Sequence, residues 1–188
     1  MSFNTIEENQ RRNLFGDQDE VWLFGYGSLI YLVDFPHLES RPASIRGWSR
    51  RFWQGSHDHR GTVDRPGRVV TLIESPGEVC GGVAYRVEAA VFAQLDEREK
   101  NGYLRVATEM TFDDGSSATG ITYLAGPDNA AYLGEADERD IADQICAARG
   151  ASGDNSDYLL ELAVALRELG LSDPHVFAIE SHILDRQR

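Results

Sequence analysis

The stretch Val21-Trp22-Leu23-Phe24-Gly25-Tyr26-Gly27-Ser28-Leu29-Ile30-Tyr31 decides the fold, because an apolar strand runs directly into a turn of small residues that contains no charge. Strand-forming side chains carry the chain to Gly25, and the glycines permit backbone angles that other residues avoid. The amides of Gly27, Ser28 and Leu29 can then converge on one spot, which is a geometry that binds anions. An ordinary strand-to-loop turn remains an alternative, since this glycine spacing is common.

The length and composition predict one domain. The chain has 188 residues, of which 41% are hydrophobic, so it can build a sizeable core without disulfides or a metal. Residues 1–19 are polar and predict either a loosely ordered N-terminal arm or an edge helix that the core does not require. We expect a single domain over residues 20–188.

The charge and cysteine content restrict the partners and the compartment. A formal net charge of −13 repels polyphosphate and argues against nucleic acid or an anionic membrane as a partner. The longest uncharged run, residues 21–33, is shorter than the roughly 20 residues that a bilayer requires. Cys80 and Cys146 show no metal-ligand spacing, and no secretion signal is evident at the N-terminus, so we expect reduced thiols in a cytoplasmic protein.

A run of arginines follows the glycine turn and makes this region locally basic. Two interpretations stay open, a solvated face paired with carboxylates or a site for a small anionic substrate. The run consists of Arg41, Arg46, Arg50, Arg51, Arg60, Arg65 and Arg68.

The order of the predicted elements favours an α+β fold. Strands are expected from residue 21 to Gly25 and at 43–48, 50–54, 68–74, 81–87, 104–112 and 118–124, and helices at 88–100, 136–149, 157–169 and 174–184. Because strands and helices are largely segregated, the pattern predicts an α+β domain with flanking helices instead of a doubly wound sheet, and its mixed or mostly antiparallel sheet is either open or closed into a small β-barrel.

Glu99 occupies an unusual position in the helix predicted at 88–100. The apolar stripe of Val91, Phe92 and Leu95 continues by one step of four onto Glu99, so a carboxylate lies on the buried face near the negative end of the helix dipole. A structural pair with Arg98 or Arg105 is one explanation. The other is catalytic, because desolvation raises a carboxyl pKa toward neutrality and produces an acid/base catalyst. Asp96 and Glu97 are expected on the solvated surface.

Other catalytic arrangements are absent from the sequence. There is no nucleophile elbow around a serine, no evident Cys/His pair and no zinc signature. His57 and His59 lie on one side of an extended segment, but no third metal ligand is evident, so no metal is expected.

The motifs together resemble those of the glutathione-specific γ-glutamylcyclotransferases, the ChaC family, from Val21 to about Leu166. The segments that carry the resemblance are the opening stretch over residues 21–30, 46–55, His59-Arg60-Gly61, 66–72, 82–85, Arg98-Glu99 with Gly102-Tyr103, 132–134 and 150–160. One departure is the gap of Lys100 and Asn101, which is shorter than in many members, and another is Tyr31, where animal members commonly have Trp.

The resemblance implies a small barrel with flanking helices that converts glutathione into 5-oxoproline and cysteinylglycine without a cofactor. It assigns the acid/base role to Glu99, and it implies that the turn holds the γ-glutamyl end of the substrate. The expected substrate-binding residues are Tyr26, Gly27, Ser28, Leu29, Ile30 and Tyr31, and we add Tyr103 and Tyr158 as pocket residues. A cyclotransferase for another γ-glutamyl amine or dipeptide, and a non-catalytic module that binds small anions or a partner, are the alternatives.

Overall fold

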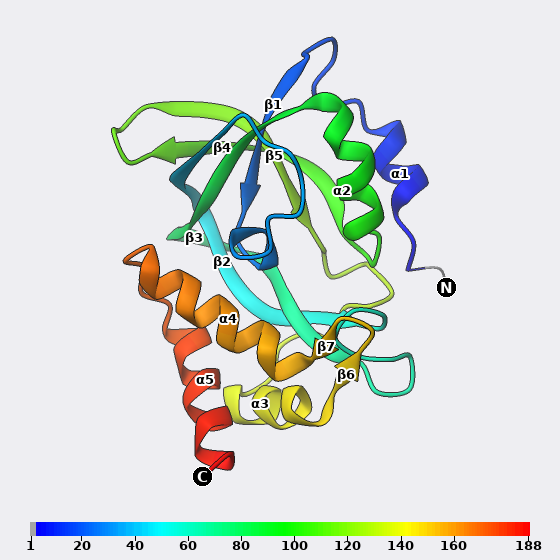
Figure 1. Ribbon diagram of the computed structural model, residues 1–188, viewed down its shortest axis with the longest axis vertical. Coiled ribbons are helices and arrows are strands. Elements are labelled where there is room, and N and C mark those ends of the chain that lie inside the picture. The colour runs from blue at the N-terminus through cyan, green and yellow to red at the C-terminus, as the bar shows by residue number, and fades with distance from the viewer. Residues whose placement is uncertain (1–2) are drawn as a thin grey trace.

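Five strands form a closed barrel in the computed structural model, which describes residues 3–188 (Figure 1). Around the barrel the order is β1-β3-β2-β4-β5; β1 and β5 pair in parallel, and the other neighbours are antiparallel. The predicted α+β class, a mixed and mainly antiparallel barrel with flanking helices, is therefore confirmed. The strands are β1 (Glu20–Gly25), β2 (Glu39–Ser56), β3 (Gly67–Glu88), β4 (Leu104–Phe112) and β5 (Ser117–Leu124).

Two strands are longer than the sequence pattern predicts. The segments expected as separate strands at 43–48 and 50–54 form the single strand β2, and those at 68–74 and 81–87 form β3. Gly47 and Gly77 have φ values of 84° and 87°, and the register between β2 and β3 shifts between Arg46 and Trp48. The glycines therefore bend a continuous ladder, as in a β-bulge, where the sequence analysis placed strand ends.

The helices form two groups on the barrel (Figure 1). Helices α3, α4 and α5 pack together on one side, and α1 lies beside α2. Their bounds, with those of two short turns and a small hairpin, are α1 (Ile6–Arg11), η1 (Ser28–Ile30), η2 (Ala89–Val91), α2 (Phe92–Arg98), α3 (Glu138–Ala147), β6 (Arg149–Gly150), β7 (Gly153–Asp154), α4 (Asn155–Glu168) and α5 (Pro174–Arg186). Among residues 3–188, no helix combines the length and the apolar character that spanning a bilayer requires.

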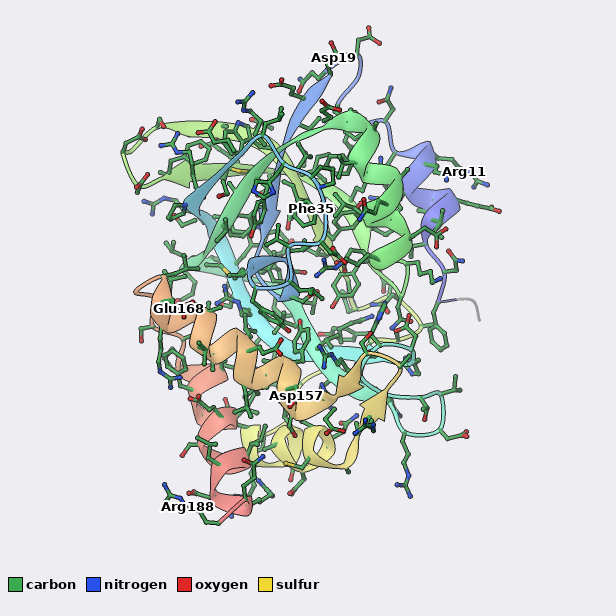
Figure 2. All side chains as sticks on the ribbon, viewed as in Figure 1. Arg11, Asp19, Phe35, Asp157, Glu168 and Arg188 are labelled. Carbon is green, nitrogen blue, oxygen red and sulfur yellow. The ribbon has the colours of Figure 1, made fainter. Side chains whose placement is uncertain are left out.

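One hydrophobic cluster connects the inside of the barrel to the helices. Leu23 and Phe24 of β1 are both fully buried, although successive strand residues point to opposite faces of the barrel wall, and Leu159 and Leu162 of α4 are fully buried in the helical layer. Phe35 is buried, and its ring packs edge-on against Tyr85 with 5.1 Å between the ring centres, whereas Figure 2 shows the charged Arg11, Asp19 and Arg188 at the outline of the molecule. The barrel and the helical layer therefore share one core.

The N-terminal segment includes a helix that contacts the barrel. Within residues 3–19 the structure describes α1, which corresponds to the edge-helix alternative, and residues 1–2 lie outside the described part. Asn9 is fully buried; its Nδ2 donates to the Tyr103 carbonyl at 3.0 Å, and its Oδ1 accepts from the Arg105 amide at 2.8 Å. The segment therefore touches the chain just after Glu99.

Candidate active site

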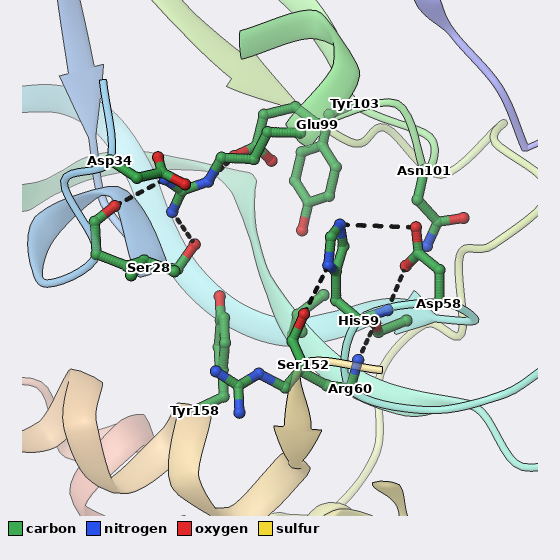
Figure 3. Close-up of a pocket in the computed structure, with 14 residues that line it drawn as sticks. Ser28, Asp34, Asp58, His59, Arg60, Glu99, Asn101, Tyr103, Ser152 and Tyr158 are labelled. Carbon is green, nitrogen blue, oxygen red and sulfur yellow. Dashed lines mark hydrogen bonds and ion pairs between the residues drawn. The ribbon is translucent and has the colours of Figure 1, made fainter. Parts of the chain in front are cut away.

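Two adjoining hollows share Glu99, and Figure 3 shows the larger one. The larger has a volume of about 190 Å³ and the smaller about 30 Å³. Ser28, Glu99, Tyr103 and Tyr158 line both. These side chains come from η1, the end of α2, the segment before β4, and α4, so the fold gathers residues that are far apart in the sequence.

Glu99 follows the last residue of α2 and is largely removed from solvent. Its amide donates to the Leu95 carbonyl at 2.9 Å, and its side chain is 15% exposed, in line with its place on the apolar stripe. Burial raises the pKa of Glu99 to about 7; the Arg98 guanidinium opposes this rise, and the negative charges of Asp34 and Asp58 add to it. Near neutral pH this carboxyl can therefore both accept and return a proton.

Arg98 connects Glu99 to the glycine turn. Its Nε lies 3.5 Å from Glu99 Oε1, and its Nη2 donates to Ser28 Oγ at 3.0 Å. Its Nη1 donates to the Leu32 carbonyl at 2.7 Å and pairs with Asp34 Oδ1 at 2.5 Å. One guanidinium thus fixes the loop on one side and faces the titrating carboxyl on the other.

The glycines of the turn are needed for close packing. Neither Gly25 nor Gly27 has a positive φ, but Gly27, with φ of −130° and ψ of −128°, lies outside the α and β regions that other residues occupy, as the sequence analysis expected for this glycine. A Cβ on Gly27 would lie 2.6 Å from Val70 Cγ2 and 3.0 Å from Tyr158 Oη, and one on Gly25 would lie 2.8 Å from Leu29 Cβ. The backbone therefore approaches its neighbours more closely than any side chain would allow.

The expected substrate-binding residues of the turn divide into two sets. Tyr26, Gly27, Ser28 and Leu29 line the smaller hollow with Glu99. Ile30 and Tyr31 line neither of the two hollows. Tyr31 packs edge-on against the Tyr158 ring at 6.2 Å and donates through its hydroxyl to the Tyr158 carbonyl at 3.3 Å, which places it behind the pocket wall.

Tyr103 and Tyr158 both line the pocket but differ in their hydrogen bonds. The Tyr103 hydroxyl donates to the Val70 carbonyl at 2.5 Å, so its proton is engaged. The Tyr158 hydroxyl instead accepts from the Val70 amide at 3.3 Å, which leaves its own proton available for another acceptor. Burial raises the pKa of both hydroxyls well above the usual range, so each is protonated at neutral pH.

Asp96 is buried, and the expectation that it lies on solvated surface is wrong. The residue is 1% exposed, and Arg105 binds its carboxylate at two points, Nε to Oδ1 at 2.9 Å and Nη2 to Oδ2 at 2.5 Å. The Tyr123 hydroxyl also donates to Oδ1 at 2.7 Å. Arg105 therefore pairs with Asp96, which leaves Arg98 as the arginine beside Glu99.

The arginine run that follows the turn does not gather at one site. Arg50 is buried and pairs with Asp173 at 2.7 Å, while buried Arg68 donates to the Phe52 and Gly134 carbonyls, both at 3.0 Å. Arg41 pairs with Asp114 at 2.8 Å near the end of β4. From this run, only Arg60 lines the larger hollow.

Several residues at the site were not expected from the sequence. They are Leu32, Asp34, Ser56, Asp58, Asn101 and Ser152. Asp58 and Ser152 lie in or beside the motifs at 59–61 and 150–160, which the sequence analysis used only as marks of resemblance. Among residues 3–188, no three His, Cys, Asp or Glu side chains are grouped so that they could hold a metal ion.

Known proteins resemble this chain over most of its length. Residues 21–186 match the family described as ChaC-like protein. Gamma-glutamylcyclotransferase 2-3 of Arabidopsis thaliana is 44% identical over 87% of this chain and 88% of the relative. Glutathione-specific gamma-glutamylcyclotransferase 1 of Danio rerio is 39% identical over 92% of this chain and 93% of the relative. The crystal structure of the yeast γ-glutamylcyclotransferase specific to glutathione superposes with a TM-score of 0.83 at 28% identity, over 89% of this chain and 97% of the yeast chain.

Proposed function

The chain belongs to the ChaC-like family, and from that premise we propose that it is a glutathione-specific γ-glutamylcyclotransferase, which converts glutathione into 5-oxoproline and cysteinylglycine. We infer the substrate from the names of its relatives, which are described as specific to glutathione. The observation that carries the chemistry is the Glu99 carboxyl, with a pKa of about 7 and a position in the pocket against the glycine turn.

The reaction is an intramolecular acyl transfer. The substrate α-amine attacks the γ-carbonyl carbon, a carbon–nitrogen bond closes a five-membered lactam, and the amide bond to cysteine breaks. Because a free α-amine has a pKa of roughly 7.7–8.0, much of it is protonated at neutral pH and needs a base before it can attack. Glu99 takes this proton and returns it to the departing amide nitrogen, so one carboxyl serves both steps. As written, the chemistry needs no cofactor.

The turn orients the γ-glutamyl group. In the proposal, the substrate α-carboxylate lies against the amides of Gly27, Ser28 and Leu29, with the Ser28 hydroxyl held by Arg98. Fixing a flexible γ-glutamyl chain so that its amine meets its own carbonyl lowers the barrier by up to about 7–11 kcal/mol in ideal intramolecular cases.

Tyr158 is the preferred donor to the oxyanion of the tetrahedral intermediate. Its hydroxyl proton is available, whereas that of Tyr103 already binds the Val70 carbonyl. Tyr103 then shapes the wall of the pocket. Comparing the Phe variants tests this assignment, because Tyr158→Phe removes the donor and Tyr103→Phe removes only a bond within the wall.

The proposal also places the protein in the cytoplasm. Cys80 and Cys146 are both free thiols, which supports action in the reducing cytoplasm.

Product analysis tests the proposed function. Purified protein is incubated with reduced glutathione, and 5-oxoproline, cysteinylglycine and free glutamate are quantified, with Glu99→Gln in parallel. We expect the first two products in equal amounts and a loss of about 10²–10⁴-fold in Glu99→Gln, as for the removal of a general acid/base. Glu97→Gln is the matched control, since Glu97 is exposed on the same helix.

Three outcomes contradict the proposal. Free glutamate in place of 5-oxoproline would mean hydrolysis. Full activity in Glu99→Gln would remove its catalytic role. No product from glutathione, but turnover of γ-glutamyl-alanine or γ-glutamyl-lysine, would move the assignment to another γ-glutamyl substrate.

A further inference from the structure

The larger hollow extends beyond Glu99 to a second polar end formed by Arg60, His59 and Ser152 (Figure 3). Figure 3 shows Arg60 and Ser152 across the pocket from Glu99, with the His59 ring between Ser152 and Tyr103. The proposed cyclisation uses only the end that contains Ser28 and Glu99. The outer end therefore has no role in the steps described above.

Arg60 is a buried cation without a carboxylate partner among residues 3–188. It is 9% exposed, and within the described part of the chain its side chain donates one hydrogen bond, from Nη1 to the Asp154 carbonyl at 3.0 Å. Its guanidinium carbon lies 5.9 Å from the centre of the Tyr158 ring. Arg98, the other arginine of the pocket, is by contrast paired with Asp34 and Glu99. Burying a charge without a counterion is costly, so a site of this kind favours an anionic ligand.

The surroundings of Arg60 hold it in place. Its amide donates to Ser56 Oγ at 2.9 Å. The turn between β6 and β7 is fixed to the same segment, since the Ser152 amide donates to the His59 carbonyl at 2.9 Å. The His59 ring is hydrogen-bonded through Nδ1 to Ser152 Oγ at 2.9 Å. The outer end is thus organised before any ligand binds.

Asp58, the nearby carboxylate, is directed at His59. Its Oδ1 accepts from the His59 amide at 2.7 Å, and its Oδ2 lies 3.7 Å from His59 Nε2. Arg60 is therefore left to interact with whatever enters the pocket.

We infer that Arg60, with His59 and Ser152 beside it, binds a carboxylate at the end of the substrate opposite the γ-glutamyl group. The inference rests on the proposed function, because it takes the γ-glutamyl end to lie at Ser28 and Glu99. The enzyme then selects γ-glutamyl peptides that end in a free carboxylate over γ-glutamyl amines and over peptides with a blocked C-terminus. A tripeptide such as glutathione carries a carboxylate for each end of the pocket.

The inference is tested by changing the substrate carboxylate and the arginine in the same set of measurements. We compare kcat/KM for glutathione and for glutathione whose glycine carboxylate is replaced by a carboxamide, in the wild type, in Arg60→Gln and in Arg65→Gln. Arg65 is exposed on the neighbouring loop and carries the same charge, so it is the matched control. The wild type is expected to prefer glutathione by about 10- to 100-fold, the range for one charge-assisted hydrogen bond. Arg60→Gln should lose this preference, because kcat/KM should fall more for glutathione than for the carboxamide, and Arg65→Gln should keep it.

Equal kcat/KM values for the two peptides in the wild type would overturn the inference without touching the proposed function. An equal fall for both peptides in Arg60→Gln would also overturn it, because the arginine would then act only on the fold. If the wild type turned over neither peptide, the proposed function would fail. The carboxylate site would then be tested by calorimetry, with the affinities of both peptides measured for the wild type and for Arg60→Gln. Tighter binding of glutathione than of the carboxamide by the wild type alone would support the site, and equal affinities of the wild type for the two peptides would overturn it.

Discussion

Asp96 and Glu99 are two largely buried carboxyl groups three residues apart, and their partners give them different roles. Asp96 is bound at two points by Arg105 and receives a third hydrogen bond from Tyr123, so its charge is fully compensated. Among residues 3–188, Glu99 pairs only with the Arg98 guanidinium, at 3.5 Å, and it faces a cavity. A two-point ion pair holds a carboxylate in one state, whereas a cavity-facing carboxyl with a pKa of about 7 can exchange its proton.

We predict that the addition of one methyl group to the glycine turn, at Gly27, lowers activity. Gly27→Ala places a Cβ 2.6 Å from Val70 Cγ2 and 3.0 Å from Tyr158 Oη, so the turn or the pocket wall against it must shift. Because a misplacement of about 1 Å can cost on the order of 10²-fold in rate, we expect kcat/KM for glutathione to fall by about that factor. Gly126→Ala is the control, since its Cβ would lie 3.8 Å from its nearest neighbour, Leu124 Cδ2. Equal activity in both variants would show that the turn does not position the substrate.

Helical periodicity was sufficient to single out Glu99, because one apolar stripe leads onto it. The same reasoning failed for Asp96, because its burial depends on contacts with Arg105 of β4 and Tyr123 of β5. Helical periodicity does not show which strands pack against a helix. Arg60 could be placed in a basic run, but separating it from Arg50 and Arg68 required the tertiary structure, which turns only Arg60 into the pocket.

At the scale of elements, the N-terminal segment supports the chain that carries the site. Thr5 donates through its amide to the Lys100 carbonyl at 3.0 Å and through Oγ1 to the Tyr103 carbonyl at 2.8 Å. Asn9 binds the Tyr103 carbonyl and the Arg105 amide. The family match begins at residue 21, so these contacts come from a part of the chain outside it. We predict that this segment stabilises the passage from Glu99 into β4.

Asn9→Ala tests this prediction. The substitution leaves the buried Arg105 amide without its partner and removes one of the two side-chain hydrogen bonds to the Tyr103 carbonyl, the other being from Thr5, so the free energy of unfolding should fall by about 1–3 kcal/mol. Urea denaturation measures the change, and Asn13→Ala, at an exposed position of the same segment, serves as the control. If both variants were as stable as the wild type, the core would not require the segment.

The type and order of the elements could be predicted from the sequence, but the lengths of β2 and β3 could not. Gly and Pro residues predict strand ends, and β4 was bounded correctly because a turn motif follows it. In β3 the strand continues through Pro76 and Gly77 because it pairs with β2 on both sides of the irregularity, up to Glu74 and again from Val79, although residues 75–78 have no partner in β2. Local turn propensity was overridden there by strand pairing.

At the scale of the whole molecule, the site lies where two layers meet. The barrel supplies the turn after β1 and the start of β3, and the helical layer supplies Tyr158 from α4. The segregation of strands and helices predicted the class of fold. The closure of the barrel could not be predicted in the same way. It depends on the parallel pairing of β1 with β5, the first and last strands of the barrel order, through Leu23 and Ile121.

A buried carboxyl with a raised pKa also affects the stability of the whole fold. The pKa of Glu99 rises from 4.5 to about 7, so the folded state binds more protons than the unfolded state between these values, and the stability of the wild type falls as the pH rises through this window. Glu99→Gln removes the penalty. At pH 8 we expect this variant to be more stable by on the order of 1–3 kcal/mol, with the difference vanishing near pH 4.5. Thermal unfolding at several pH values checks this, and a pH-independent difference would contradict it.

The pH dependence of kcat/KM for glutathione, measured in the wild type and in Arg98→Gln, tests the central claim most directly. If Glu99 is the base, activity falls below an apparent pKa of about 7 in the wild type. Removing the Arg98 cation, which favours the ionised carboxylate, should move this fall to higher pH, whereas a titration of the substrate amine would stay in place. An acid limb at the same pH in both proteins, or no limb near pH 7, would contradict the assignment of Glu99 as the acid/base catalyst.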